Sequence, residues 1–487
     1  MKNHSILKKR EVSMNLSKWL VLVMLIHALS APAGEAFGER RPAEIPFTDR
    51  GRILQLVEKG INIDRAGPET ILVWVSAEQF DWIRSQGIPV EWTEDQAKVY
   101  FEALRKSTEA TADPLGHYHT YEEMTAQLQA YATGYPSLCR LSSIGQSVQG
   151  RELWILKITD EPDVEELEPE VKYISTMHGN EPVGTEMMLN LIELLLTEYD
   201  SNPRIQTLVN ETELWIMPLM NPDGHAIADR FNANGVDLNR NFPDRVDDPT
   251  NTPEGRQPET RAVMNFSGQH SFVLSANFHT GALVVNYPYD SSFYPYISQH
   301  PDWFSPDQDV FVHISTAYAS QNPPMASSTY FPGGISNGIS WYIIHGGMQD
   351  WNYVWMGCNE VTIELSDSHI PPEDELPQYW QDNRESLLAY LEQAQIGVRG
   401  RVLDAATATP LDATVTVTGR DHDVFTDPDR GDYYRLLLPG TYELNFQCEG
   451  YFPKTISAVE VEAAEATVLD VTLESSSSQT HSNWAVY

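Results

Sequence analysis

Residues 119–394 alternate between short apolar runs typical of strands and runs with the spacing of helices. The strand-like runs are 154–158, 171–176, 214–218, 273–278 and 361–365, and the helix-like runs are 187–195 and 384–391. This alternation favours one large α/β sheet with helices packed on its faces. The acidic run 160–170 is expected to be a solvated loop between two strands. A small single module is excluded, and the length of 487 residues predicts two or three domains.

A segment of different character precedes this region. Residues 45–105 combine predicted strands at 70–75 and 88–92 with a predicted helix at 77–86. They form a small α/β module, which is a propeptide, a chaperoning segment or a permanent accessory domain. The polar stretch 106–113 is a linker, so we place the catalytic domain at 114–394.

The segment that follows is rich in short alternating strands. The predicted strands are 398–403, 413–418, 433–438, 441–446 and 467–473, separated by turn residues such as Pro439 and Gly440. Strand spacing of this kind predicts a small β-sandwich over residues 396–474. The serine-rich residues 475–487 are expected to be a disordered tail.

The first 36 residues have the order of a secretory signal. Basic residues precede an apolar core at 19–29, and Ala31 and Ala33 supply the small residues of a cleavage site. Translation from Met14 would give a signal of more typical length, and an amphipathic N-terminal helix is the alternative. No later run reaches the roughly 20 apolar residues of a transmembrane helix. We therefore expect residues 1–36 to be a signal peptide and the protein to be soluble and secreted or periplasmic.

Charge and cysteine content narrow the possible partners. The chain has 32 Lys and Arg against 69 Asp and Glu, a net charge of −37. Such a charge repels phosphate backbones and anionic lipid surfaces, so nucleic acid is not an expected partner. It favours solubility or a cationic substrate. Cys139, Cys358 and Cys448 are an odd number spread over the chain, so at most one bridge is possible and no disulfide framework is expected.

A histidine and a glutamate follow the predicted strand at 171–176. His178 and Glu181 are three residues apart at a strand-to-helix turn, where both side chains can bind one ion such as Zn²⁺. His279 ends the apolar strand at 272–279, at the edge of a sheet where such sites gather, and is a candidate third ligand. Alternatively, His178 is a satisfied histidine, Glu181 begins a helix and His279 is a core or loop residue.

The strand at 361–365 contains one carboxylate. Alternation places Thr362 and Glu364 on the face opposite Val361, Ile363 and Leu365. A carboxylate within an apolar strand is unfavourable unless it is paired or faces a cleft, so Glu364 is a candidate general base for a zinc-bound water. The alternative is a glutamate that faces solvent on a half-exposed strand.

Two further segments contain residues that could take part in binding or catalysis. Arg230, Asn239 and Arg240 lie in a turn-rich segment, where they can recognise a carboxylate and stabilise an oxyanion, or simply belong to a solvated loop. Residues 334–338 satisfy the GxSxG pattern of serine hydrolases. That pattern needs a buried strand before it and a helix after it, and the preceding Phe-Pro-Gly-Gly instead predicts a loop at the rim of a cleft.

The order and joint presence of these motifs resemble the zinc metallocarboxypeptidase family, and in particular its carboxypeptidase N/E/D-like branch. The matching segments, within residues 119–392, are HGNEPVG, NPDG, NANGVDLNRNFPD, LVVNYPYD, GGMQDWNY and EVTIELS. The resemblance implies an α/β fold: a mixed-sheet metallocarboxypeptidase domain between the small N-terminal α/β module and a transthyretin-like β-sandwich.

The resemblance also implies a role for individual residues. His178, Glu181 and His279 are the implied ligands of one Zn²⁺ per catalytic domain, and Glu364 is the implied base and proton shuttle. Arg230 matches the arginine that polarises the scissile carbonyl. Asn239 and Arg240 match the pair that holds the terminal carboxylate, and Tyr342 matches the mobile tyrosine that closes over it. Tyr353 is the weaker candidate for that last role. At Asn180, many pancreatic-type relatives carry an arginine, whose absence is usual in this branch.

Substrate preference is implied by two more positions. Asp290 matches the pocket aspartate that pairs with a C-terminal Lys or Arg in this branch, and Gln349 matches a residue lining that pocket. Alternatively, Asp290 caps a turn. The expected partners are peptide or protein C-termini, and the expected activity is that of a secreted carboxypeptidase with basic preference. Other C-terminal or cell-wall peptide specificity is the nearest alternative, and a non-catalytic peptide-binding homologue is disfavoured because every catalytic position is filled.

Overall fold

The computed structural model describes residues 40–47, 50–106, 117–463 and 465–476. It divides into two compact units, Met1–Asp95 and Gln96–Tyr487. The expected signal peptide, most of the expected linker and all but two residues of the expected tail lie outside the described residues. Within the described part of the chain, no helix combines the length and apolar character needed to cross a membrane.

The first unit contains an antiparallel four-stranded sheet in the order β2-β3-β1-β4. Its strands are β1 (Arg41–Pro46), β2 (Asn62–Ala66), β3 (Thr70–Val75) and β4 (Glu91–Trp92), and its helices are α2 (Arg50–Glu58) and α3 (Ala77–Ser85). A capping box between Ser76 and Gln79 begins α3. The predicted mixture of helix and strand is confirmed. This compact unit ends at Asp95, before the expected boundary at residue 105.

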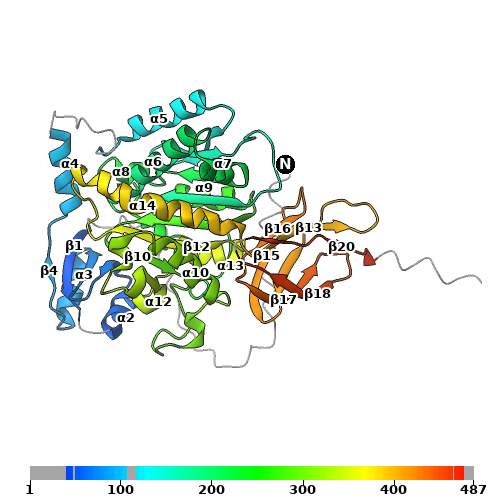
Figure 1. Ribbon diagram of the computed structural model, residues 1–487. Helices are drawn as coiled ribbons and strands as arrows, with labels where there is room; N and C mark the ends of the chain where they lie inside the picture. The colour runs from blue at the N-terminus through cyan, green and yellow to red at the C-terminus, as the bar shows by residue number, and fades with distance from the viewer. Residues whose placement is uncertain (1–39, 48–49, 107–116, 464, 477–487) are drawn as a thin grey trace, which may run out of the picture. The chain divides into compact units, whose positions relative to one another are not determined.

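An eight-stranded mixed sheet forms the centre of the second unit (Figure 1), in the order β11-β10-β12-β9-β7-β8-β6-β5. Strands β12, β9, β7 and β8 run parallel in the middle, and β6, β5 and β10 pair antiparallel to their inner neighbours. The strands are β5 (Cys139–Gln146), β6 (Glu152–Ile158), β7 (Glu170–Ser175), β8 (Glu213–Met217), β9 (Phe272–His279), β10 (Ala282–Tyr287), β11 (Ile335–Asn337) and β12 (Asn359–Ser366). The five strands predicted in this region are all present.

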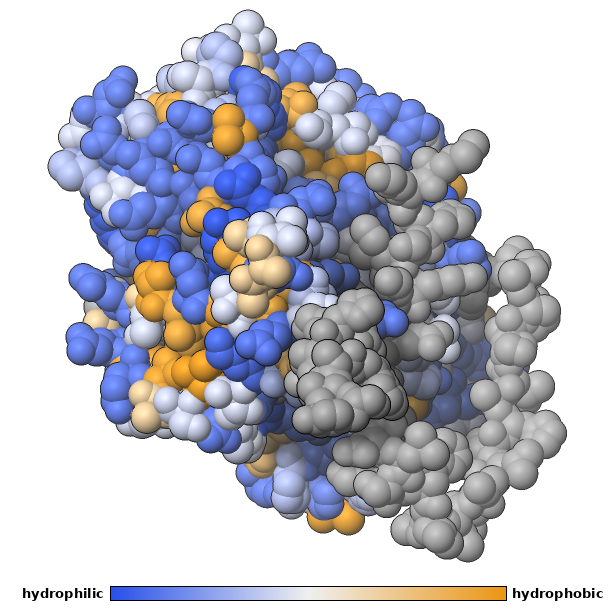
Figure 2. Space-filling model, turned by 90° about the vertical axis from the view of Figure 1, so that its right-hand side faces the viewer, coloured by the Kyte–Doolittle hydropathy of each residue, from blue (hydrophilic) through white to orange (hydrophobic). Residues whose placement is uncertain are grey.

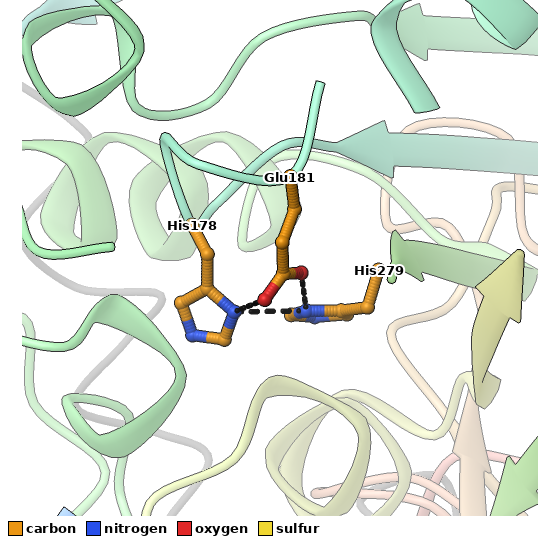
Figure 3. Close-up of side chains that lie close together, drawn as sticks. All are labelled: His178, Glu181 and His279. Atoms are coloured by element: carbon orange, nitrogen blue, oxygen red, sulfur yellow. Dashed lines mark hydrogen bonds and ion pairs between the residues drawn. The ribbon is translucent and has the colours of Figure 1, made fainter. Parts of the chain in front are cut away.

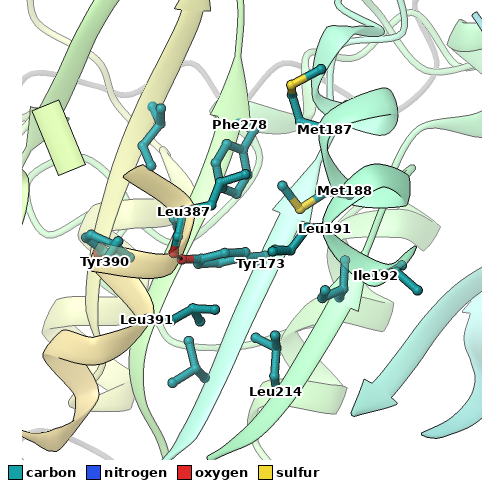
Figure 4. Packing of buried hydrophobic residues seen from close by; sticks show 14 of the residues in the cluster. Tyr173, Met187, Met188, Leu191, Ile192, Leu214, Phe278, Leu387, Tyr390 and Leu391 are labelled. Carbon is teal, nitrogen blue, oxygen red and sulfur yellow. Dashed lines mark hydrogen bonds between the residues drawn. The ribbon is translucent and has the colours of Figure 1, made fainter. Parts of the chain in front are cut away.

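Helices cover both faces of this sheet, as the sequence predicts. The helices are α4 (Gln96–Lys106), α5 (Tyr121–Gly134), α6 (Val183–Glu198), α7 (Pro203–Asn210), α8 (Pro222–His225), α9 (Pro258–Ser267), α10 (Gln308–Ala319), α11 (Pro323–Ala326), α12 (Gly338–Trp341), α13 (Met348–Met356) and α14 (Leu376–Leu391). Helices α5, α6, α10 and α14 contribute to one apolar cluster, and α9 and α13 contribute to another. Figure 4 shows the first cluster, where Tyr173 and Phe278 of the sheet meet Met188 and Leu191 of α6 and Leu387 and Tyr390 of α14.

The C-terminal part of this unit consists of two small sheets (Figure 1). One has the order β16-β13-β19 with β20 also paired to β13, and the other has the order β15-β14-β17-β18. The strands are β13 (Val398–Asp404), β14 (Thr414–Val417), β15 (Arg420–Phe425), β16 (Asp432–Arg435), β17 (Gly440–Gln447), β18 (Lys454–Val461), β19 (Thr467–Val468) and β20 (Val471–Leu473). Val415, Tyr433 and Phe446 belong to the apolar core of these sheets.

The surface on this side of the molecule is mostly hydrophilic. Figure 2 shows hydrophilic residues over much of the visible face, with hydrophobic residues in separate patches. Among the described residues of these two sheets, Phe452 and Val468 are the exposed large hydrophobic side chains. Most of the other large apolar side chains of these two sheets are therefore buried or partly buried.

Residues 334–338 are not a loop, because Ile335–Asn337 pairs with β10 as strand β11 and α12 begins at Gly338. The strand is short and lies at the edge of the sheet, so the segment still lacks the buried central strand of a serine hydrolase turn. Cys139, Cys358 and Cys448 are all free, so the single possible bridge does not form.

Candidate active site

Strands β7 and β9 bring the candidate metal ligands to one edge of the sheet. The two strands are parallel neighbours, with Ser175 opposite Phe278, so the residues that follow β7 lie beside the end of β9. His178 and Glu181 lie in the turn between β7 and α6, and His279 is the last residue of β9. Gly179 allows the backbone of Gly224 to approach this turn closely, because a Cβ atom at residue 179 would lie 2.1 Å from the backbone carbon of Gly224.

The three side chains converge on one point. Figure 3 shows both imidazoles and the carboxylate of Glu181 directed toward one another. The Nδ1 atom of His178 lies 2.9 Å from Glu181 Oε1 and 3.0 Å from His279 Nδ1, and His279 Nδ1 lies 2.9 Å from Glu181 Oε2. All three residues are at most 3% exposed. The arrangement therefore forms one compact, buried set of nitrogen and oxygen donors.

This donor set fits a zinc ion. Ligand atoms of a tetrahedral zinc site are about 3.3 Å apart when each bond is 2.0–2.1 Å long, close to the separations found here. Two imidazole nitrogens can face each other at such a distance only if a proton or a cation lies between them. Two histidines and one glutamate leave a fourth position open, as catalytic zinc requires.

Asp237 is a functional candidate that the sequence analysis missed. Its Oδ1 atom lies 2.9 Å from Nε2 of His178, the ring nitrogen that faces away from Glu181. Burial raises the pKa of the Asp237 carboxyl, but the charges of Arg230 and His178 outweigh burial and hold that pKa well below its ordinary value. A metal-binding histidine commonly donates its second nitrogen to such a carboxylate, and this rule is the signal that could have identified Asp237.

Arg230 lies beside the candidate ligands. It is 2% exposed, and its Nη1 atom donates to Glu181 Oε1 at 3.2 Å. Its Nε and Nη2 atoms lie 3.1 and 3.0 Å from Asp237 Oδ2. The guanidinium is thus fixed next to both carboxylates, with positive charge at the edge of the donor set.

Glu364 lies on β12, next to the last residue of β9. Parallel pairing places Glu364 directly beside His279, so their side chains share one face of the sheet. Glu364 is 9% exposed, which argues against a glutamate on a half-exposed strand. The structure therefore brings the candidate base and the three candidate ligands to the same edge.

Two of the residues predicted to hold a terminal carboxylate lie two and three positions after Asp237 in the chain. Asn239 and Arg240 belong to a short 3-10 helix (Leu238–Arg240), and Asn239 Oδ1 accepts a hydrogen bond from the backbone nitrogen of Met348 at the start of α13. Tyr342 directly follows α12 and is 5% exposed. The hydroxyl of Tyr353 is already bonded, because it donates to Asp307 at 2.9 Å, and the residue is 1% exposed.

Asp290 and Gln349 are both buried, and Asp350, next to Gln349 on α13, accepts hydrogen bonds from the backbone nitrogen of Asp290. Asp290 is 2% exposed, and its Oδ1 atom accepts from Asn286 Nδ2 at 3.0 Å. This partner is a side chain rather than turn backbone, which argues against a turn cap. Both polar side-chain atoms of Gln349 and the hydroxyl of Ser291 are buried without a protein hydrogen-bond partner. Buried polar atoms of this kind call for a polar ligand or water.

The position of Asp290 depends on its neighbours. A Cβ atom at Gly338 would lie 1.8 Å from Asp290 Oδ1, so a glycine is needed there. Asp350 of α13 accepts hydrogen bonds from the backbone nitrogens of Asp290 and Ser291 at 2.9–3.2 Å. Burial raises the pKa of the Asp290 carboxyl to about 7, although the side chains of Asn286 and Arg240 oppose the shift. Sequence reasoning missed Asp350, which lies 60 positions from Asp290.

Comparison with known proteins identifies the class of protein. Residues 124–386 match the family described as zinc carboxypeptidase, and residues 397–474 match the carboxypeptidase regulatory-like domain. The chain therefore belongs to the zinc carboxypeptidase family, and the resemblance predicted from its motifs is confirmed. Membership in this family implies zinc as the metal.

Carboxypeptidases D and N are among the similar proteins. Rat carboxypeptidase D is 44% identical over 384 residues, which cover 74% of this chain and 27% of that protein. The catalytic chain of mouse carboxypeptidase N is 42% identical over 401 residues, which cover 75% of this chain and 87% of that protein. The chain thus spans little more than a quarter of carboxypeptidase D, and the branch expected from the sequence is confirmed.

A solved structure agrees with the fold. Carboxypeptidase A from Helicoverpa armigera has a TM-score of 0.57 at 18% identity, covering 73% of this chain and 98% of that one. At this level of identity the likeness supports the mixed α/β metallocarboxypeptidase fold alone.

Proposed function

We propose that this chain is an exported zinc metallocarboxypeptidase that removes C-terminal Lys or Arg from peptides and proteins. The observation that carries the proposal is the convergence of His178, Glu181 and His279 beside Glu364 at one edge of the sheet. Membership in the zinc carboxypeptidase family supports the same activity. The segment 1–36 supports export through its charge and apolar pattern.

His178, Glu181 and His279 would hold the metal. A zinc ion bound there would act as a Lewis acid and lower the pKa of water. Glu364 accepts the proton of the attacking water and returns it to the leaving amine. Arg230 contributes positive charge where the carbonyl oxygen becomes negative. Its ion pairs with Glu181 and Asp237 keep it at that edge of the site.

The substrate is oriented through its C-terminus. Asn239 and Arg240 bind the terminal carboxylate, and Tyr342 closes over it. A guanidinium can pair with a carboxylate through two parallel hydrogen bonds, so Arg240 suits this role. Fixing the carboxylate places the last peptide bond next to Glu364 and excludes cleavage farther along the chain.

The pocket around Asp290 selects the last side chain. The carboxyl of Asp290, the amide of Gln349 and the hydroxyl of Ser291 offer buried acceptors. A cationic side chain would satisfy these acceptors and the charge of Asp290 together, whereas an apolar side chain would leave them without partners. This difference favours C-terminal Lys and Arg over neutral residues.

One assay tests the proposal. The purified chain is given peptides that differ only in the last residue, with and without a chelator, alongside Glu364→Gln and Asp290→Asn. We expect hydrolysis of Lys- and Arg-ending peptides that chelation abolishes. Glu364→Gln should bind zinc and lose about 10²–10⁴-fold in kcat, the usual contribution of a general base. Asp290→Asn is the matched control, which should still hydrolyse peptides but lose the basic preference. Near wild-type turnover by Glu364→Gln would refute the assignment.

We also propose a division of the chain into functional parts. The catalytic domain is 114–394, the β-sandwich is 396–474, and the N-terminal module precedes them. Limited proteolysis between residues 95 and 117, followed by the same peptide assay, distinguishes a removable propeptide from a permanent accessory module. A rise in activity after cleavage supports a propeptide, and unchanged activity supports the accessory module.

A further inference from the structure

A buried carboxylate joins the catalytic part of the second unit to its C-terminal sheets. Asp307, immediately before α10, is fully buried. Its two oxygens lie 2.7 and 3.0 Å from Nη2 of Arg435 on β16, which is also fully buried. Arg420 on β15 donates to the same carboxylate at 2.9 Å. One aspartate is therefore held by two arginines of the C-terminal sheets.

Tyr353 of α13 completes this cluster. Its hydroxyl donates to Asp307 Oδ2 at 2.9 Å, and the tyrosine is 1% exposed. The ring of His422, on β15, stacks on the ring of Tyr353 with centroids 3.9 Å apart and planes 13° apart. Figure 1 shows α10, α13 and β15 next to one another, and residues of α13 contact β15. The C-terminal sheets therefore contact α13 through the side chain of Tyr353.

The same helix carries one side of the substrate pocket. Gln349 lies four residues before Tyr353, so the two side chains project from one face of α13 about one turn apart. Asp350, also on α13, binds the backbone nitrogen of Asp290. The ring of Tyr353 also contacts the ring of Tyr289, the residue before Asp290, with centroids 5.8 Å apart. Movement of Tyr353 would therefore shift both walls of the pocket.

We propose that Asp307 and Tyr353 are positioning residues for the basic pocket, held in place by Arg420 and Arg435 of the C-terminal sheets. This inference rests on the proposed function of Asp290 and Gln349. A buried ion cluster adds little net stability compared with apolar packing, but removal of one member leaves an uncompensated charge. Because every charge of the cluster needs its partner, the C-terminal sheets can dock on the catalytic part in one arrangement only. That arrangement fixes the position of α13. The C-terminal sheets thereby take part in substrate selection.

Tyr353→Phe is the sharpest test, because it removes one hydroxyl and keeps the ion pairs of Asp307 with Arg420 and Arg435. We expect KM for an Arg-ending peptide to rise about 3- to 10-fold, the usual size of such coupling, with kcat within twofold and zinc content unchanged. The ratio of kcat/KM for Arg-ending over Ala-ending peptides should fall by the same factor. Asp307→Asn should have a larger effect in the same direction. Arg399→Gln is the matched control, since Arg399 of β13 donates to Gln395 and lies outside the cluster.

The same variants are also made in the Glu364→Gln background, where affinity for fluorescent Arg- and Ala-ending peptides is measured without turnover. Lower unfolding midpoints with wild-type KM, affinity and Arg:Ala ratio would overturn the inference and leave a merely structural cluster. If Asp307→Asn does not fold, the KM, affinity and Arg:Ala ratio of Tyr353→Phe alone decide whether the inference holds. If the wild-type chain prefers another C-terminal residue, the proposed basic specificity fails, and the inference is judged on KM and affinity for the preferred peptide. If no peptide binds the wild-type chain, both proposals are rejected.

Discussion

Asp237 connects the candidate ligand His178 to Arg230 through its two oxygens. Asp237→Asn keeps the shape of the side chain but turns one acceptor into a donor and removes the charge that orients His178. We expect zinc affinity to fall about 10- to 100-fold, the usual effect of losing such a partner. Competition with a chromogenic chelator measures it. Asp248→Asn, at a half-exposed carboxylate paired with Arg256, is the control and should bind zinc normally. Unchanged affinity in Asp237→Asn would show that His178 needs no partner.

Asp290 should give the substrate preference its own pH dependence. Its pKa is raised to about 7, and burial is the largest cause of this shift. The charge of Asp244 also raises the pKa, whereas the charge of Arg240 lowers it. A raised pKa leaves the carboxyl neutral at low pH, so attraction for a cationic side chain should be lost as the pH falls. Below the pKa, the charged fraction drops about tenfold per pH unit.

The ratio of kcat/KM for Arg-ending over Ala-ending peptides isolates this effect, because titration of the catalytic groups affects both substrates alike. We expect the ratio to rise between about pH 6 and pH 8, and to be flat in Asp290→Asn. A wild-type ratio independent of pH would mean that Asp290 stays charged throughout or does not contact the substrate.

At the scale of helices and strands, the sequence predicted those elements whose pattern is local. Strands β7, β9 and β12 are apolar runs that end in polar residues, and this local pattern is sufficient to identify His178, His279 and Glu364 as candidates. Strand β1 was missed because Pro42 and Pro46 are unusual in strands. Strand β15 was missed because its sequence, RDHDVF, is mostly polar.

Partners that are distant in sequence could not be predicted. Asp237 meets His178 across 59 positions, Asp350 meets Asp290 across 60, and Asp307 meets Arg435 across 128. Each pairing depends on how the sheet and its connections bring separate segments together. No local pattern distinguishes these aspartates from the many acidic residues that face solvent.

A buried network connects α13 to the central strands. Lys172 of β7 donates to Asn352 of α13 at 2.7 Å, and Asn352 donates to Glu360 of β12 at 2.6 Å. Lys172 and Glu360 are fully buried. Burial raises the pKa of Glu360, and the charge of Lys172 opposes that shift. The network thus holds α13 over the strands that carry His279 and Glu364.

Lys172→Met should remove this opposing charge and raise the pKa of Glu360 further. A carboxyl with a raised folded pKa contributes stability below its unfolded pKa and loses it as the pH rises toward the folded pKa. We therefore expect the destabilisation of Lys172→Met to grow as the pH rises above the ordinary pKa of a glutamate, reaching about 3–5 kcal/mol, the range for a broken buried pair. Urea unfolding at several pH values measures it. Lys454→Met, at a partly exposed lysine of β18, is the control. A pH-independent loss would mean that only packing was disturbed.

For the molecule as a whole, the Asp307 cluster links the stability of the C-terminal sheets to that of the catalytic part. Burial raises the pKa of Asp307, but Arg435, His422 and Arg420 outweigh burial and lower it to about 2. A carboxyl with a depressed folded pKa contributes stability above its unfolded pKa, near 3.8, and loses it as the pH falls through the folded value. That contribution is about 2 kcal/mol and should disappear between about pH 4 and pH 2.

Comparison of the wild-type chain with Asp307→Asn separates this effect from general acid unfolding. The net charge of −37 means that many carboxylates are protonated in the same range, but their contribution is common to both chains and cancels in the difference. We expect the difference in unfolding free energy to be constant above pH 4 and to shrink by about 2 kcal/mol toward pH 2. Asp309→Asn, whose carboxylate is 47% exposed and paired with Arg420, should show a much smaller change. A difference that stays constant down to pH 2 would mean that the two arginines do not hold Asp307 ionised, and that the C-terminal sheets dock on the catalytic part by packing alone.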